Sequence, residues 1–205
     1  MPRSTEVPRC VAITDGALDL GRVRGVAFQS WLRDLHRHGV ALQIREKHLG
    51  DGELYSIART IREGFAGCLL VNGRLDIAFA AGADGVHLTS TSAPPERVRD
   101  WAADHRLLIG VSTHSLSEIR DAEKSRLDYV VFGPVFPTPS KARFGAPQGL
   151  EQLEEATRVS ELPVLAVGGI DPGNAAEALA AGAHGVAAIR GFADPQALAT
   201  RTQEG

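Results

Sequence analysis

Short apolar segments recur along the whole chain, and most of them are rich in valine, isoleucine and leucine. Runs of roughly four to eight such residues, bounded by glycine, proline or charged residues, are typical of strands that are buried on both faces. The pattern therefore predicts eight strands, at residues 10–14, 39–44, 67–72, 84–88, 107–112, 128–133, 162–169 and 184–189.

Stretches with helical spacing separate most of these strands. Apolar residues recur three or four positions apart in residues 54–61 and again in residues 150–159. The SLSE segment at 115–118 has the composition of a capping box, and the Asp-Pro pairs at 171–172 and 194–195 predict helix starts. We therefore expect a repeated unit of strand, loop and helix.

An internal echo supports this unit, because AAGADGVH at 80–87 returns as AAGAHGVA at 180–187. Each copy reads as a helix end, a glycine turn and a new strand. Eight such units predict an α/β fold, a single compact (β/α)₈ TIM barrel that spans residues 1–205 as one domain. A doubly wound open sheet is the main alternative, because the alternation of strands and helices does not show whether the sheet closes into a barrel. Residues 133–148 form a long irregular stretch, which is interpreted as a loop that covers the ligand site of the barrel.

Composition narrows the classes of partner. A formal net charge of −3 and a pI near 6.2, without a run of like charges, favour small molecules over nucleic acid or anionic membranes. No apolar run approaches the ~18 residues that span a bilayer, and the first ten residues lack a secretion signal, so a cytoplasmic protein is expected. Cys10 and Cys68 are isolated, and both are expected to be reduced and buried.

The second predicted strand ends in a group of polar residues. Alternation along GVALQIREK places Gln43, Arg45 and Lys47 on one face, while the apolar residues between them point toward the helices. In barrels of this kind the chemistry lies at the carboxyl ends of the strands. Lys47 or Glu46 alone would be interpreted as a surface charge, but the three residues together favour anion binding.

Two glycine-containing segments predict a phosphate site. Gly168 and Gly169 follow the seventh strand, and the backbone of Ile189, Arg190 and Gly191 follows the eighth, where barrels commonly bind a phosphate monoester. The paired glycines could instead serve only a tight turn. Arg190 could add a charge-assisted hydrogen bond to the phosphate or could project into solvent.

Further candidates lie after strands five and six. Thr138, Ser140 and Lys141 in the PTPSK segment suit a second anionic group, although this is also ordinary loop composition. His114 shares strand parity with Ser112 and could move a proton near neutral pH, or could bond its own backbone at a turn. The other histidines, including His87, are interpreted as core, loop or helix-end residues, and no cluster has metal-ligand spacing.

Taken in order, QIREK, NGRLDIA, GADGVHL, IGVSTHS, DYVVFGPVFPTPSK and AVGGI resemble the thiamine phosphate synthase / thiazole tautomerase family over nearly the whole chain. The resemblance implies a (β/α)₈ fold, often dimeric, and ligands derived from a thiazole alcohol phosphate. The synthase pattern has an Asn-Asp pair after strand three and an Asp after strand four, and these acids hold the Mg²⁺ that accompanies a pyrimidine diphosphate.

This chain departs from the synthase pattern at both acids. Asn72 is followed by Gly73, and the segment after strand four ends in Ser92. Neither residue supplies the carboxylate that Mg²⁺ prefers. The Asn-Gly-Arg sequence resembles the tautomerase branch, which implies a metal-free isomerase. Arg190 also departs from the family, which usually has a small hydroxyl residue there.

We therefore expect a thiazole tautomerase-like isomerase, without metal or cofactor, whose substrate is a small carboxylated thiazole phosphate. Gln43, Asn72 and Ser112 would help to bind that substrate. Cationic Arg45 and Lys47 would lie near its carboxylate, and His114 would move the proton that makes the ring aromatic.

Two alternatives remain. One is thiamine phosphate synthase, with Mg²⁺ bound through other acids such as Asp15 or Asp76. The other is a catalytically silent barrel that binds a phosphate ligand and regulates a partner. A homodimer is possible in each case.

Overall fold

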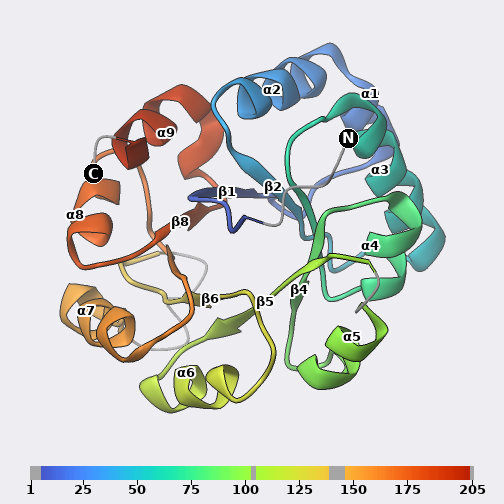
Figure 1. The fold of residues 1–205 in the computed structure, drawn as a ribbon. Helices are drawn as coiled ribbons and strands as arrows, with labels where there is room; N and C mark the ends of the chain where they lie inside the picture. The colour runs from blue at the N-terminus through green and yellow to red at the C-terminus, as the bar shows by residue number, and fades with distance from the viewer. Residues whose placement is uncertain (1–5, 103–104, 139–145, 204–205) are drawn as a thin grey trace.

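The computed structural model describes residues 6–102, 105–138 and 146–203, and these form a closed barrel of eight parallel strands (Figure 1). Each strand pairs with its neighbours in chain order, and β8 pairs with β1. The predicted (β/α)₈ TIM barrel is therefore confirmed, and the open sheet is excluded. The strands are β1 (Cys10–Ile13), β2 (Ala41–Ile44), β3 (Leu69–Asn72), β4 (Gly85–Leu88), β5 (Leu108–Thr113), β6 (Tyr129–Phe132), β7 (Val164–Val167) and β8 (Gly185–Ala188).

Helices surround the barrel as an outer ring (Figure 1). Leu54, Ile57, Ala58 and Ile61 form the buried face of α3, as their spacing predicts. The described helices are α1 (Leu20–Arg24), α2 (Val26–Arg37), α3 (Asp51–Gly64), α4 (Leu75–Ala81), α5 (Pro95–Trp101), α6 (Leu116–Glu123), α7 (Gly149–Val159), α8 (Ala175–Ala180), η2 (Gly191–Ala193) and α9 (Pro195–Gln203).

Two of the three predicted helix starts are confirmed. The Ser115 side chain accepts a hydrogen bond from the backbone N–H of Glu118 at the start of α6. Asp194 accepts from two backbone N–H groups at the start of α9, where Pro195 is the first helical residue. The third start is wrong, because α8 begins at Ala175 and the Asp171 side chain instead closes a turn with Gly173 N–H.

Strand alternation divides the apolar residues into two cores. One lies inside the barrel and includes Val11, Leu70, Leu108 and Leu165. The other lies between strands and helices, and its strand residues are the alternate ones, such as Leu42 and Ile44. Because successive side chains of a strand point to opposite faces, this division shows which polar residues face the barrel interior. Cys10 and Cys68 are both free thiols, but only Cys10 is fully buried.

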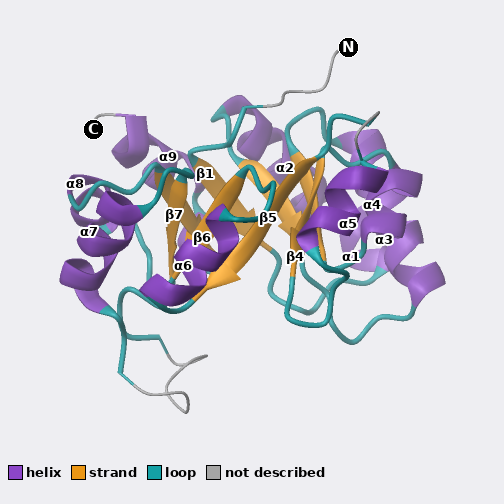
Figure 2. Ribbon diagram, turned by 60° about the horizontal axis from the view of Figure 1, so that its bottom comes forward, coloured by secondary structure: helices purple, strands orange, loops and turns teal. Residues whose placement is uncertain are grey.

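The strands all point to one end of the barrel, and the described part of the β6–α7 connection extends from that end (Figure 2). At the opposite end, two aspartates hold neighbouring strands together. Asp84 accepts from the backbone N–H of Leu69 and pairs with Arg62, with both distances 2.8 Å. Asp128 does the same with Ile109 and Arg99, with both distances 2.6 Å. These contacts stabilise the closed end of the barrel and leave the carboxyl ends of the strands for ligands.

Glu46 fixes the loop after β1. Its side chain accepts hydrogen bonds from the backbone N–H groups of Gly16 at 3.2 Å and Leu18 at 3.1 Å. The residue is only 4% exposed, so its interpretation as a surface charge is wrong. The physical reason is that a buried carboxylate is tolerated where backbone donors satisfy its oxygens.

None of the helices in the described residues is long and apolar enough to cross a membrane.

The Glu46 contacts generate a stability prediction. In Glu46→Gln, one of the two accepting oxygens becomes an NH₂ group that faces an N–H donor, and the charge is lost. We expect the free energy of unfolding to fall by about 1–3 kcal/mol, the usual cost of an unsatisfied buried group. Urea denaturation measures the change. Glu53→Gln removes the same charge from an exposed site on α3 and should change stability by less than about 0.5 kcal/mol. Equal stability of the two variants would contradict the assignment.

Candidate active site

Polar side chains from five neighbouring strands line the inner wall of the barrel, from the core toward the carboxyl ends of the strands. We call this set the polar belt, and its members are Gln43 of β2, Asn72 of β3, His87 of β4, Ser112 of β5 and Tyr129 of β6. Gln43 Nε2 donates to Asn72 Oδ1 at 3.2 Å. Strand register then places Asn72 beside His87. The belt therefore brings the predicted residues Gln43, Asn72 and Ser112 to one wall of the barrel.

His87 lies at the centre of the belt. Its Nε2 is 2.9 Å from Ser112 Oγ, and its Nδ1 is 3.3 Å from the Tyr129 hydroxyl oxygen. Burial, with a smaller contribution from the charge of Arg45, lowers the pKa of His87 to about 4. His87 is therefore neutral near pH 7. It acts on its neighbours through hydrogen bonds and not through charge.

Sequence reasoning missed two members of the belt. His87 is a satisfied core residue, as predicted, but its side chain lies on the inner wall and contacts the site. Strand parity could have found it, because His87 lies two residues after Gly85 on the inner face of β4. Tyr129 was not singled out, because a tyrosine at the start of an apolar strand carries no distinctive signal.

Arg45 supplies positive charge close to the belt. It is half-buried, its backbone N–H donates to Thr14 Oγ1 at 2.8 Å, and its charge reaches His87. Leu42 and Ile44 pack in the core between strands and helices, so the predicted parity of β2 is confirmed. Lys47 lies beyond the end of β2 and is exposed. An anion at this end of the barrel would therefore meet Arg45 close to the neutral donors of the belt.

The predicted phosphate segments lie at the ends of β7 and β8. Gly168 and Gly169 have φ of +93° and +67° and pack closely against the residues that follow β6. A Cβ on Gly169 would lie 2.6 Å from the carbonyl oxygen of Pro137, so glycine is required here by close packing, whatever the ligand. Ile189 and Arg190 are exposed, and Gly191 begins η2. The assignment of phosphate to these segments stays a prediction.

His114 directly follows β5, and its side chain contacts the start of the loop after β6. Its Nδ1 donates to the carbonyl oxygen of Gly133, because a carbonyl only accepts, and its own carbonyl accepts from Gln148 Nε2 at 3.0 Å. In the tautomer with a single ring proton, this contact places the proton on Nδ1 and leaves Nε2 as an acceptor. Thr138, in the connection between β6 and α7, is half-buried, whereas Ser140 and Lys141 lie outside the described residues. The catalytic role of His114 stays a prediction.

The positions of the two missing acids face each other. A Cβ on Gly73 would lie 3.9 Å from Ser92 Oγ and 3.7 Å from Thr89 Oγ1. The hydroxyls are hydrogen-bonded among themselves, since Ser92 Oγ is 3.2 Å from Thr89 Oγ1 and accepts from the Thr89 N–H at 3.0 Å. These neutral oxygens do not fit Mg²⁺, which prefers carboxylates.

Asp76 lies beside Gly73 and Ser92, and an arginine holds its carboxylate. Arg74 forms a bidentate ion pair with Asp76, with Nη2–Oδ2 at 2.6 Å and Nε–Oδ1 at 3.0 Å, and also contacts Asp51. The hydrogen bonds from Arg74 lower the pKa of Asp76. Among the described residues no group of three or more histidines, cysteines or acids could hold a metal ion. The donor set therefore does not match the magnesium site of the synthase pattern.

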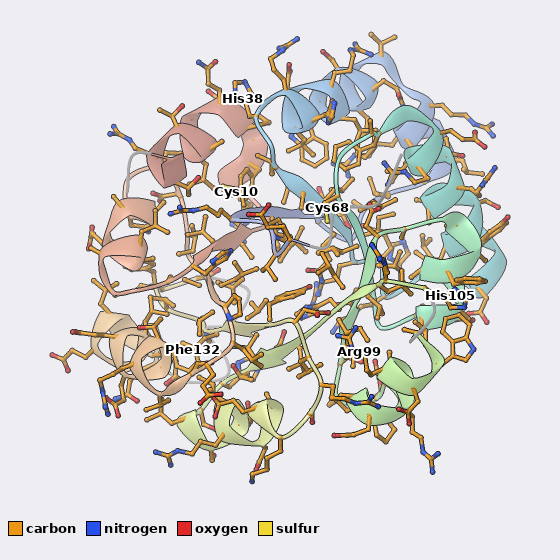
Figure 3. The ribbon with its side chains drawn as sticks, viewed as in Figure 1. Cys10, His38, Cys68, Arg99, His105 and Phe132 are labelled. Carbon is orange, nitrogen blue, oxygen red and sulfur yellow. The ribbon has the colours of Figure 1, made fainter. Side chains whose placement is uncertain are left out.

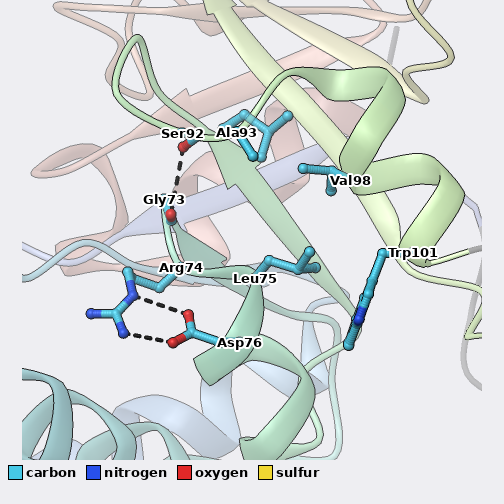
Figure 4. A pocket seen from close by; sticks show the side chains of 9 residues that line it. Gly73, Arg74, Leu75, Asp76, Ser92, Ala93, Val98 and Trp101 are labelled. Atoms are coloured by element: carbon cyan, nitrogen blue, oxygen red, sulfur yellow. Dashed lines mark hydrogen bonds and ion pairs between the residues drawn. The ribbon is translucent and has the colours of Figure 1, made fainter.

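A hollow of about 350 Å³ opens beside these positions (Figure 4). Apolar side chains of Leu75, Leu88, Val98 and Trp101 line much of it, and Gly73 and Ser92 lie on its rim. Leu88 and Val98 belong to the core between strands and helices, so the hollow lies on the outer side of β4. It is distinct from the polar belt, which lies on the inner side.

Three further titratable residues, His105, Cys10 and Cys68, are not members of the polar belt. Figure 3 shows His105 at the periphery of the barrel, where it contacts Phe79 and Trp101 at ring centroid distances of 4.6 and 5.1 Å. Cys10 Sγ is 2.8 Å from Thr202 Oγ1, and burial raises the pKa of its thiol. Burial also raises the pKa of Cys68 to about 12. Neither thiol is suited to act as a nucleophile at neutral pH.

Comparison with known proteins identifies similar sequences and a similar structure. The family model described as thiamine monophosphate synthase matches residues 10–192. A thiamine-phosphate synthase of Moorella thermoacetica is 41% identical over 80% of this chain and 80% of its own length. One of Clostridium novyi is 37% identical over 83% of this chain and 85% of its own. The structure of a thiamine phosphate pyrophosphorylase from Pyrococcus furiosus aligns with a TM-score of 0.77 at 32% identity, covering 96% of this chain and 94% of that one.

These relatives correct the expected activity. The isomerase interpretation, including the thiazole tautomerase assignment, is wrong, because the similar proteins are named as synthases and the matching family model describes a synthase. The absence of acids at Gly73 and Ser92 is real, but it does not by itself indicate a different reaction. A match over residues 10–192 and identities of 37–41% over most of the chain lead to one assignment. This chain belongs to the thiamine monophosphate synthase family.

Proposed function

We propose that the protein is a transferase of the thiamine-phosphate synthase type, which joins a thiazole phosphate to a pyrimidine diphosphate and releases diphosphate. The observation that carries this proposal is the identity of 37–41% to synthases over at least 80% of the chain. The polar belt supports it, because its residues suit a polar ligand that carries an anionic group.

The proposed role of Arg45 and Ser112 is to hold the diphosphate. Diphosphate gains negative charge as it leaves, so a half-buried guanidinium and a hydroxyl donor nearby would stabilise the transition state. Lys47, Thr138, Ser140 and Lys141 are proposed to add to this binding. Gln43 and Asn72 would orient the pyrimidine through their amides.

The thiazole phosphate is proposed to bind at the other side of the barrel mouth. Gly168, Gly169 and the backbone of residues 189–191 would hold its phosphate, with Arg190 beside them. This division gives each substrate its own anion site. It leaves the two reacting groups facing each other across the open end of the barrel.

The absence, among the described residues, of carboxylates around Gly73 that could hold Mg²⁺ favours one second candidate function. A protein that binds both ligands without joining them would act as a catalytically silent regulator. Incubation of the pure protein with both substrates distinguishes these functions. Formation of thiamine phosphate together with diphosphate supports the transferase, whereas binding of both ligands without turnover supports the regulator.

Arg45 provides the first test of the site. In Arg45→Gln the charge near the belt is lost while a shorter polar side chain remains. We expect turnover to fall by about 10- to 100-fold, the equivalent of one charge-assisted hydrogen bond. Diphosphate release measured at saturating thiazole phosphate gives the effect. Arg59→Gln removes an exposed charge on α3 and should leave the rate unchanged. If both variants keep full activity, Arg45 does not hold the leaving group.

The phosphate assignment can be tested at Ile189. Its side chain is 38% exposed and lies two residues beyond Ala187, which faces the interior, so a substitution there avoids the clash expected at Gly169. Ile189→Asp should lower affinity for thiazole phosphate by at least about tenfold, because a carboxylate would repel the phosphate. Calorimetric titration measures the change, with the neutral Ile189→Asn as control. Unchanged affinity in the Asp variant would place the phosphate elsewhere.

The metal mismatch can be tested by restoring the acids. Gly73 has φ of +73°, a conformation that aspartate and asparagine tolerate better than most residues, and the atom nearest to a Cβ there would be Thr89 Cγ2 at 3.5 Å, an ordinary contact. The double variant Gly73→Asp, Ser92→Asp should bind Mg²⁺ with inorganic diphosphate at least about tenfold more tightly than the wild type. The matched double asparagine variant should show no gain. Equal, tight binding by the wild type would mean that other residues hold the metal.

A further inference from the structure

Three side chains of the polar belt form a continuous path from the core to the barrel mouth. Tyr129 is 1% exposed and His87 is 3% exposed, whereas Ser112 is exposed at the mouth. The hydroxyl oxygen of Tyr129 lies 3.3 Å from His87 Nδ1, and Ser112 Oγ lies 2.9 Å from His87 Nε2. The buried end of this path can therefore influence the hydroxyl at its exposed end.

A neutral histidine carries one ring proton, so the path has two possible directions. If Nδ1 is protonated, it donates to Tyr129, and Ser112 donates to Nε2. If Nε2 is protonated, Tyr129 donates to Nδ1, and Nε2 donates to Ser112. Only the second arrangement leaves the Ser112 proton available for a ligand.

The buried hydroxyl of Tyr129 decides between these directions. Within the described residues, the structure gives this hydroxyl one hydrogen-bond partner, His87 Nδ1. If Tyr129 accepted from Nδ1, its own proton would have no acceptor in the core, which is a costly arrangement. If it donates, only a spare lone pair is left unused. Burial raises the pKa of Tyr129 and lowers that of His87, so both groups are neutral and the direction is retained near pH 7.

The tyrosine ring is held in place by the neighbouring strand. A Cβ on Gly110 would lie 2.1 Å from Tyr129 Cζ, so the ring packs directly on the backbone of β5. The rings of His87 and Tyr129 are 5.9 Å apart between centroids. Because this packing fixes the position of the hydroxyl oxygen beside His87 Nδ1, Tyr129 is suited to orient His87.

We infer that Tyr129 is a positioning residue: it donates to His87 Nδ1, keeps the ring in the Nε2–H form, and thereby makes Ser112 a hydrogen-bond donor toward an anion at the mouth. The opposite tautomer would present Ser112 lone pairs, which repel an anion. The last step rests on the proposed function, because it takes the anion to be the diphosphate of a substrate. The tautomer does not depend on that function.

Nitrogen-15 NMR of histidine-labelled wild-type protein tests the tautomer directly, because protonated and unprotonated ring nitrogens have well-separated shifts. His87→Gln identifies the signal by its loss. We expect an unprotonated Nδ1 and a protonated Nε2 for His87 near pH 7. In Tyr129→Phe the tautomer protonated at Nδ1 should appear, while Tyr55→Phe, at a tyrosine that is 40% exposed, should leave the spectrum unchanged. A wild-type ring protonated at Nδ1 overturns the inference.

A double-mutant cycle with inorganic diphosphate tests the link to Ser112. Tyr129→Phe should weaken diphosphate binding by about 2- to 10-fold, the worth of one hydrogen bond. The same substitution in a Ser112→Ala background should have no further effect, because the group through which it acts is gone. An equal loss in both backgrounds overturns the inference. If the wild type does not bind diphosphate at all, the proposed anion site and the link to Ser112 both fail, while the NMR result still decides the tautomer.

Discussion

Closure of the eight parallel strands is the constraint on which the rest of the molecule depends. A closed sheet has an inside that side chains must fill and an outside that helices must cover, so each strand residue belongs to one of two cores. Apolar side chains that point inward, among them Val11, Leu70, Leu108 and Leu165, fill the barrel. The polar belt can exist because these layers support it from below.

The electrostatics of the belt follow from its depth. Charged groups are costly to bury, and the belt accordingly consists of neutral amides, hydroxyls and an imidazole whose pKa is lowered to about 4. Each buried side-chain nitrogen and oxygen atom in the described residues has a hydrogen-bond partner. Positive charge is supplied from the edge by Arg45, which is only half-buried. This arrangement suits the proposed binding of an anion while it keeps the wall itself uncharged, and it is the reason why we infer a role for the hydrogen-bond directions within the wall.

The surroundings of Gly73 show why one altered motif does not define a reaction. Hydroxyls of Thr89 and Ser92 occupy the place where the synthase pattern has a carboxylate, and the neighbouring Asp76 is paired with Arg74. The donor set therefore no longer suits Mg²⁺. The polar belt nevertheless lines the inner side of the barrel, and the relatives at 37–41% identity are named thiamine-phosphate synthases. The altered residues Gly73 and Ser92 follow the ends of β3 and β4, whereas the members of the polar belt lie within the strands, so one set can change while the other is kept.

The sequence by itself determined the eight strands, the helices between them and the parity of Gln43 and Arg45, because these depend on local alternation and spacing. The order of the motifs also identified the family. Only the tertiary structure decided that the sheet closes, that Glu46 is buried against the loop after β1, and that Gly169 packs on Pro137. It also brought His87, Ser112 and Tyr129 together from three strands. The physical reason is that burial and hydrogen-bond partners come from residues far apart along the chain, about which local periodicity holds no information.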